Sequence, residues 1–81
     1  MLNIATTTKL SPEETLKEAV EFFGPKGLGL KIKDQDAGCA TFEGSGGGVF
    51  ISTCAADKGT SVEFESREWD YQVKEFIRKI H

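Results

Sequence analysis

The chain has 81 residues, 38% of them hydrophobic and 28% charged, and a net charge of −3. A chain of this length is expected to form a single domain, 1–81, without room for a second module. Its acidic balance argues against a general binder of nucleic-acid backbones, because such a binder needs a basic stripe to displace counterions.

The first third of the chain predicts a strand followed by a helix. Residues 2–8, LNIATTT, are rich in β-branched side chains and favour a strand. Ser11 is a suitable N-cap, Pro12 fits the first helical position and Glu14 completes a capping box. Apolar residues then recur at helical spacing, at Leu16, Ala19, Val20 and Phe23. A Gly-Pro pair directly after Phe23 is expected to end this helix.

Four further strands and a second helix are predicted. In the first of these strands, 27–34, apolar residues alternate with glycine or lysine, which places Leu28, Leu30 and Ile32 on one side. The others are 39–43, 49–56 and 60–67, each bounded by turn residues. The final segment, 68–80, has a helical apolar stripe made of Trp69, Val73, Phe76, Ile77 and Ile80.

Four glycines lie between residues 44 and 48, and they pose a choice between a phosphate loop and a turn. A phosphate-binding loop requires a following helix and a lysine at fixed spacing, and neither is present. We therefore interpret Gly46-Gly47 as the turn of a hairpin and Lys58-Gly59 as the next turn. Both turns place the same residues on one face: Phe42, Val49, Ile51, Val62 and Phe64. Residues 28–32 join this face if a bulge or an odd-length loop lies near Asp36.

The predicted fold class is α+β, with the element order β-α-β-β-β-β-α. Four hairpin-linked strands form an antiparallel meander, and two amphipathic helices need one apolar surface to cover. The expected architecture is a two-layer sandwich, in which a five-stranded antiparallel sheet carries both helices on one face.

The opposite sheet face is the expected location of a functional site. It is mostly polar, and Phe50 is its large apolar exception. The candidate ligand- or partner-binding residues are Thr41, Phe50, Ser52, Cys39 and Cys54. The assumed register sets Cys39 directly opposite Cys54, within disulfide range, which would permit a redox pair. The alternative is two reduced, partly buried side chains, as is usual in a cytosolic protein.

Other chemistry has little support in the sequence. The single histidine is the last residue, His81, and no histidine or helix start is expected beside either thiol. We expect no catalytic residues, no metal site and no cofactor. No signal peptide or membrane-spanning run is recognised, so the expected location is cytoplasmic, without a membrane role.

The predicted element order resembles one repeat of the TATA-box-binding protein, in which helices cover one face of a curved sheet. This resemblance concerns the topology of nearly the whole chain. It implies the strand order 1-5-4-3-2, with residues 2–8 beside residues 60–67, and an open face that binds nucleic acid.

Three functions follow, in decreasing order of expectation. The first is a non-catalytic binding module, which takes a protein partner, a second copy or a small ligand on the open face or between sheet and helices. The second is a thiol redox protein or small enzyme that uses Cys39 and Cys54. The third is a saddle-type nucleic-acid binder, which is disfavoured because the open face carries Glu43, Glu63 and Glu65.

Overall fold

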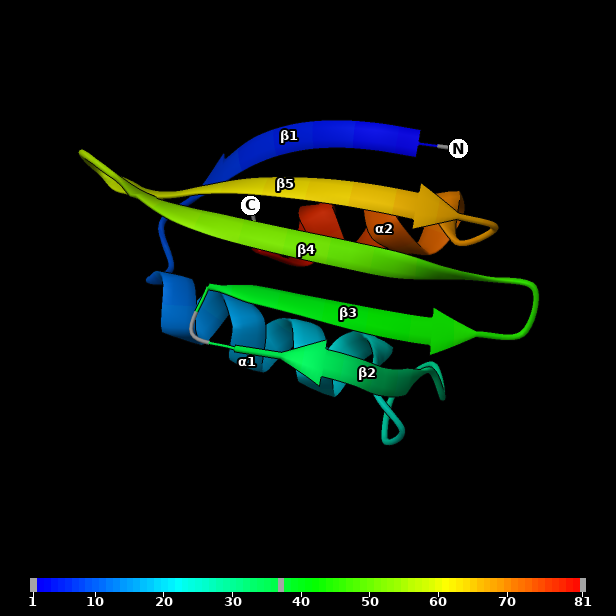
Figure 1. Cartoon of the computed structure of the whole chain (residues 1–81). Coiled ribbons are helices and arrows are strands. Elements are labelled where there is room, and N and C mark those ends of the chain that lie inside the picture. Colours follow the sequence, from blue (N-terminus) through cyan, green and yellow to red (C-terminus); the bar gives the residue numbers. More distant parts are fainter. Residues whose placement is uncertain (1, 37, 81) are drawn as a thin grey trace.

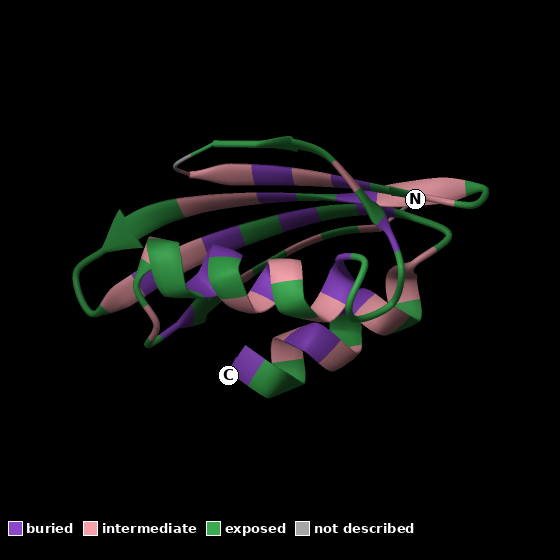
Figure 2. Ribbon diagram, turned by 90° about the horizontal axis from the view of Figure 1, so that it is seen from below, coloured by how far each residue is buried: buried purple, intermediate pink, exposed green. Residues whose placement is uncertain are grey.

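A computed structural model of the chain describes residues 2–36 and 38–80, so His81 lies outside the described part. The model has the predicted α+β fold, with five strands in one open sheet and two helices. The elements are β1 (Leu2–Thr8), α1 (Pro12–Phe23), β2 (Lys31–Gln35), β3 (Cys39–Gly44), β4 (Gly47–Ala56), β5 (Gly59–Arg67) and α2 (Asp70–Ile80). Figure 2 shows both helices on the same side of the sheet, as expected.

The strand order across the sheet is β1-β5-β4-β3-β2, and all neighbouring strands are antiparallel (Figure 1). The same order was implied by the resemblance in topology stated above. β4 is the central strand, with β5 on one side and β3 on the other, while β1 and β2 form the two edges. β4 and β5 are the longest strands of the sheet. One face of every strand is therefore available for packing against the helices, and the other face is left uncovered.

α1 begins where the capping pattern predicts. The Ser11 hydroxyl oxygen accepts a hydrogen bond from the Glu14 amide at 3.1 Å, which satisfies one of the free amides of the first turn. The Thr15 hydroxyl donates to the Ser11 carbonyl at 2.8 Å and is fully buried, a role that the sequence did not suggest. Gly24 ends the helix, with its amide bonded to the Val20 carbonyl.

The core lies between the sheet and the helices, and aromatic rings form its centre. The ring of Phe76 lies 5.2 Å from that of Phe23 and 5.9 Å from that of Phe64, measured between centroids. Phe23 also contacts Phe42 at 5.6 Å. Phe42, Val49, Ile51, Val62 and Phe64, the five sheet residues expected to face the helices, are all buried, which confirms the predicted face of β3, β4 and β5. The predicted helical stripes also face the core, and Val20, Trp69 and Ile77 are their half-buried members. Burial of each large side chain contributes roughly 1.5–3 kcal/mol.

Both predicted turns are displaced by one residue. The β3–β4 turn is Ser45-Gly46, flanked by the pair Gly44↔Gly47, because Gly46 is the hairpin residue that adopts a positive φ, of 80°. Phe42 consequently lies opposite Val49, whereas the prediction paired it with Ile51. A one-residue displacement of a turn moves every partner by two positions, so each residue keeps its face.

The β4–β5 turn is Asp57-Lys58, and the sequence-based choice of Lys58-Gly59 is wrong in the same way. Gly59 instead opens β5 opposite Ala56, with a φ of 142°, and a β-carbon at this position would collide with the Thr8 carbonyl group. Thr53 therefore pairs with Val62, not with Phe64. The core face is again unchanged.

β2 is shorter than predicted. It starts at Lys31, so Leu28 lies outside the strand, in a turn, and its side chain is exposed. The Leu28 amide donates a hydrogen bond to the Phe22 carbonyl at 2.9 Å. Leu30 is buried and Ile32 is half-buried, as expected. The bulge lies between Ile32 and Asp34, earlier than the expected position near Asp36. Lys33 is the extra residue, and its side chain reaches the open face.

Candidate functional site

The open face is the side of the sheet that the helices leave uncovered. By strand alternation it consists of the following residues, to which the bulged Lys33 is added: Asn3, Ala5, Thr7, Lys31, Asp34, Cys39, Thr41, Glu43, Gly48, Phe50, Ser52, Cys54, Ala56, Ser61, Glu63, Glu65 and Arg67. The antiparallel register arranges them in rows that cross the strands. Two adjacent rows form the candidate site.

The first row crosses the sheet at Gly48. Glu43 of β3 and Arg67 of β5 both pair with Gly48, one from each side. Since neighbouring strands lie about 4.8 Å apart, the α-carbons of Glu43 and Arg67 are about 10 Å apart, with no side chain between them. The missing side chain leaves a gap in the polar surface, and the backbone of β4 forms its floor.

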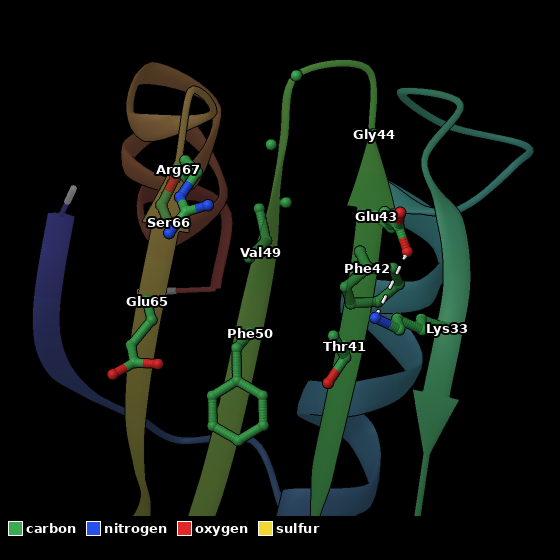
Figure 3. Close-up of a pocket in the computed structure, with 13 residues that line it drawn as sticks. Lys33, Thr41, Phe42, Glu43, Gly44, Val49, Phe50, Glu65, Ser66 and Arg67 are labelled. Carbon is green, nitrogen blue, oxygen red and sulfur yellow. Dashed lines mark ion pairs between the residues drawn. The ribbon is translucent and has the colours of Figure 1, made fainter.

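The second row crosses the sheet at Phe50, which pairs with Thr41 on one side and Glu65 on the other. Its ring is 36% exposed, the only large aromatic side chain of the sheet with that much exposure among the described residues. Figure 3 shows the ring standing between Thr41 and Glu65. Phe50 lies two positions along β4 from Gly48 on the same face, and both residues line one depression.

Together the two rows enclose a shallow depression of about 580 Å³. Its lining includes Lys33, Glu43, Gly48, Phe50, Glu65 and Arg67. This volume suits a small molecule or a few residues of a peptide. We call it the glycine depression below.

The charges around the glycine depression are not all paired. The Lys33 ammonium lies 3.8 Å from a Glu43 carboxylate oxygen, and both side chains are exposed, so this pair adds little stability. In the described part of the chain, Arg67 and Glu65 make no ion pair. The Arg67 guanidinium is thus a free cationic group at the rim, able to bind a carboxylate through two parallel hydrogen bonds.

The structure brings some of the predicted site residues together and separates others. Thr41 and Phe50 lie directly opposite each other and both line the depression. Cys39 and Ser52 are the next opposed pair, with sulfur and hydroxyl oxygen 3.9 Å apart, just outside the depression. Cys54 is exposed and pairs with Ser61, nearer the β4–β5 turn.

The predicted opposition of Cys39 and Cys54 is wrong, because the hairpin register differs by two positions. Both cysteines are free thiols. Since Cys39 lies opposite Ser52, Cys54 is its diagonal neighbour, and such neighbours lie about 7–8 Å apart. A disulfide usually requires α-carbons closer than about 7 Å, so the geometric basis for a redox pair is lost.

The remaining glycines of the run serve packing. The indole of Trp69 lies against Gly44, where an added β-carbon would come within 2.6 Å of a ring atom. Gly47 similarly lies close to the Arg67 carbonyl group. The glycine run therefore provides a turn at Gly46, close contacts with Trp69 and with the end of β5, and a gap at Gly48 on the open side.

Sequence reasoning assigned Glu43 and Glu65 to the open face but did not recognise that Glu43 and Arg67 lie on the two sides of a glycine. The glycine run contains the residue that forms the gap, but only the correct hairpin register shows which side chains lie beside Gly48. Within 2–36 and 38–80, no three histidine, cysteine or acidic side chains come close enough to hold a metal ion. No helix in this part is long and apolar enough to cross a membrane.

Comparison with known proteins gives a fold and no family. No protein-family model matches the chain, and no curated protein matches it in sequence. The chain is similar in structure to the protein SSP2350 from Staphylococcus saprophyticus, which is known from an X-ray crystal structure. The match has a TM-score of 0.54 and 16% sequence identity, and it covers 94% of this chain and 78% of that one. At this identity the likeness concerns the fold alone.

Proposed function

We propose that this protein is a non-catalytic binding module whose ligand site is the glycine depression on the open face. The observation that carries the proposal is the juxtaposition of a side-chain gap at Gly48, an exposed aromatic ring at Phe50 and an unpaired guanidinium at Arg67. Phe50 is the large apolar side chain of an otherwise polar face, and it lies within the same depression as Gly48 and Arg67.

The chemistry of the site favours a small carboxylate that carries a flat apolar group. The apolar group would stack on the ring of Phe50. The carboxylate would bind the Arg67 guanidinium, while the absence of a side chain at Gly48 allows the ligand to approach the backbone. The Phe50 and Gly48 rows are about 6.8 Å apart along the strand, which matches the spacing of ring and carboxylate in an arylalkanoate.

The other two functions receive less support. The thiol function needs two sulfur atoms in reach of each other, and the register sets Cys39 opposite Ser52. The nucleic-acid function needs a basic face, but Glu43, Glu63 and Glu65 all lie on the open face. The resemblance to the TATA-box-binding protein thus remains a proposal about topology and does not guide the choice of ligand.

The proposal is tested with 3-phenylpropionate and its uncharged counterpart, 3-phenylpropionamide. A fragment of this size gains roughly 0.3 kcal/mol per heavy atom, so we expect a dissociation constant on the order of millimolar for the carboxylate. Ligand-detected saturation-transfer NMR measures such weak binding. The amide should bind about fivefold more weakly, because it cannot form the charge-assisted pair with Arg67.

Two variants of exposed arginines provide the matched comparison. Arg67→Gln should remove the preference for the carboxylate, whereas Arg78→Gln, on the exposed side of α2, should leave it unchanged. Phe50→Ala should weaken both probes. The proposal is wrong if neither probe binds, or if the preference for the carboxylate survives in Arg67→Gln.

A further inference from the structure

The two edges of the sheet differ in how well they are protected from pairing with another strand. The edge strand β2 is short, carries Lys31, Lys33 and Asp34, and is interrupted by a bulge. These are the devices by which natural sheets prevent association at an edge. β1 has none of them: its seven residues include no charge and no proline, and its pairing with β5 is unbroken from Leu2 to Thr8.

Apolar side chains lie directly beneath this unprotected edge. Leu2 and Ile4 face the helix side of β1 but are only half-buried. Ile77 of α2 is half-buried as well. The Lys79 ammonium pairs with Glu18 of α1 at 3.5 Å, so Lys79 marks the side of α2 that faces α1. Ile77 is two residues earlier, about 200° around the helix, and therefore lies on the side toward the β1 edge.

We propose that the outer edge of β1 is a docking surface for a second copy of this chain. The two β1 strands pair antiparallel about a two-fold axis and form one continuous sheet across both protomers. Seven paired residues provide roughly seven main-chain hydrogen bonds. This inference concerns a different surface from the glycine depression and does not depend on the proposed ligand.

The sequence of β1 is complementary to itself in this arrangement. With the two-fold axis at Ala5, Ala5 lies opposite its own copy. Asn3 then lies opposite Thr7, and Ile4 opposite Thr6. No charged side chain meets another in these pairs. The nearest acidic groups, Glu63 and its copy, stand three strand spacings apart, about 14 Å, which exceeds the screening length at physiological salt.

The helix layer also fits a two-fold arrangement. α2 contacts both β5 and β1, and the Thr8 hydroxyl donates to the Ile80 carbonyl at 2.6 Å, so this helix lies under the edge of the sheet. Joining two β1 strands would bring the two α2 helices to about 10 Å from each other, the usual distance of packed helices. The half-buried Leu2, Ile4 and Ile77 of each protomer would then cover those of the other.

The need to cover the half-buried side chains of the helix layer favours a second copy over an unrelated peptide. Any extended strand could form the main-chain hydrogen bonds of β1. Only a partner that also has an apolar helix at the same depth below its strand would bury Leu2, Ile4 and Ile77. A copy of the chain brings that helix with it.

The test measures the mass of the full chain by sedimentation velocity between about 5 and 500 μM, where a weak dimer becomes populated. Ala5→Lys sets two lysines opposite each other at the two-fold axis, while in each protomer the new lysine lies across from Glu63, so the fold is retained. Ala56→Lys is the matched control, because Ala56 is equally exposed but lies near the β4–β5 turn.

We expect a concentration-dependent dimer for the wild type and for Ala56→Lys. Ala5→Lys and Ala5→Glu alone should each raise the dimer dissociation constant about fivefold, and an equimolar mixture of the two should restore it, since opposite charges then meet at the axis. A protein that stays monomeric throughout contradicts the inference. So does a dimer that Ala5→Lys leaves unchanged, because it would use another surface.

Discussion

The two faces of the sheet are built from the same five strands, yet they differ in burial and composition. The face toward the helices contributes Phe42, Val49, Ile51, Val62 and Phe64, all buried. The open face contributes one large apolar side chain, Phe50, surrounded by charged and small polar residues. Adjacent residues of one strand therefore have different surroundings: one face packs into the core, and the other, which we propose as the binding face, is left uncovered.

The largest expected effect comes from removing a phenylalanine ring from the core between sheet and helices, compared with removing one from the open face. Phe76 is fully buried and its ring packs against those of Phe22, Phe23 and Phe64. Phe76→Ala should cost about 3–5 kcal/mol of the free energy of unfolding, a large part of what a small domain possesses. Phe50→Ala should cost less than about 1 kcal/mol. Urea unfolding followed by circular dichroism measures both, and equal losses would refute the division between the faces.

A smaller effect is expected where a glycine of the hairpin contacts Trp69, the residue directly before α2. Gly44→Ala would place a β-carbon 2.6 Å from the Trp69 ring, and the resulting shift should cost about 1–3 kcal/mol. Gly38→Ala is the control, since its β-carbon would meet its nearest neighbour, the Thr53 carbonyl oxygen, at 3.6 Å. Thermal unfolding should therefore show a lower midpoint for Gly44→Ala alone. Identical unfolding midpoints would mean that the packing of Trp69 does not require a glycine at position 44.

The smallest difference is expected between two adjacent threonines of β1. Thr8 is buried and its hydroxyl donates to the Ile80 carbonyl, whereas Thr7 is exposed on the open face. Thr8→Val should cost about 1–2 kcal/mol, because it leaves a buried carbonyl without its donor. Thr7→Val should change the free energy of unfolding by less than about 0.5 kcal/mol. Denaturant titration measures both variants. An equal loss in the free energy of unfolding would contradict the different roles of Thr8 and Thr7.

The sequence predicts which face of the sheet a residue lies on better than it predicts which residue lies opposite it on the next strand. The reason is geometric. Strand alternation and helical spacing assigned most buried residues correctly because these patterns repeat over many positions. Leu28 is the exception, because the strand starts only at Lys31. Each turn was displaced by one residue, which leaves the faces intact but changes every cross-strand pair. The choice among adjacent glycines depends on Trp69, which is distant in sequence and packs on Gly44.

The same limit applies to the candidate site. Thr41 and Phe50 were both placed on the open face, where the structure has them, because that inference needs only strand alternation. That they lie directly opposite each other was not predicted. The opposition of Cys39 and Cys54 needed the exact register and was wrong. Arg67 was not recognised as a site residue, because its position opposite Gly48 also depends on the register.

The measurement that tests the division of the two faces most directly is a map of amide chemical shifts of labelled protein titrated with 3-phenylpropionate. We expect the shifts to cluster at Thr41, Gly48, Phe50 and Arg67 and to disappear in Phe50→Ala, while the spectrum of that variant stays that of a folded protein. Shifts centred on α1 or α2 would contradict the account, because the ligand would then bind the face that we assign to stability alone.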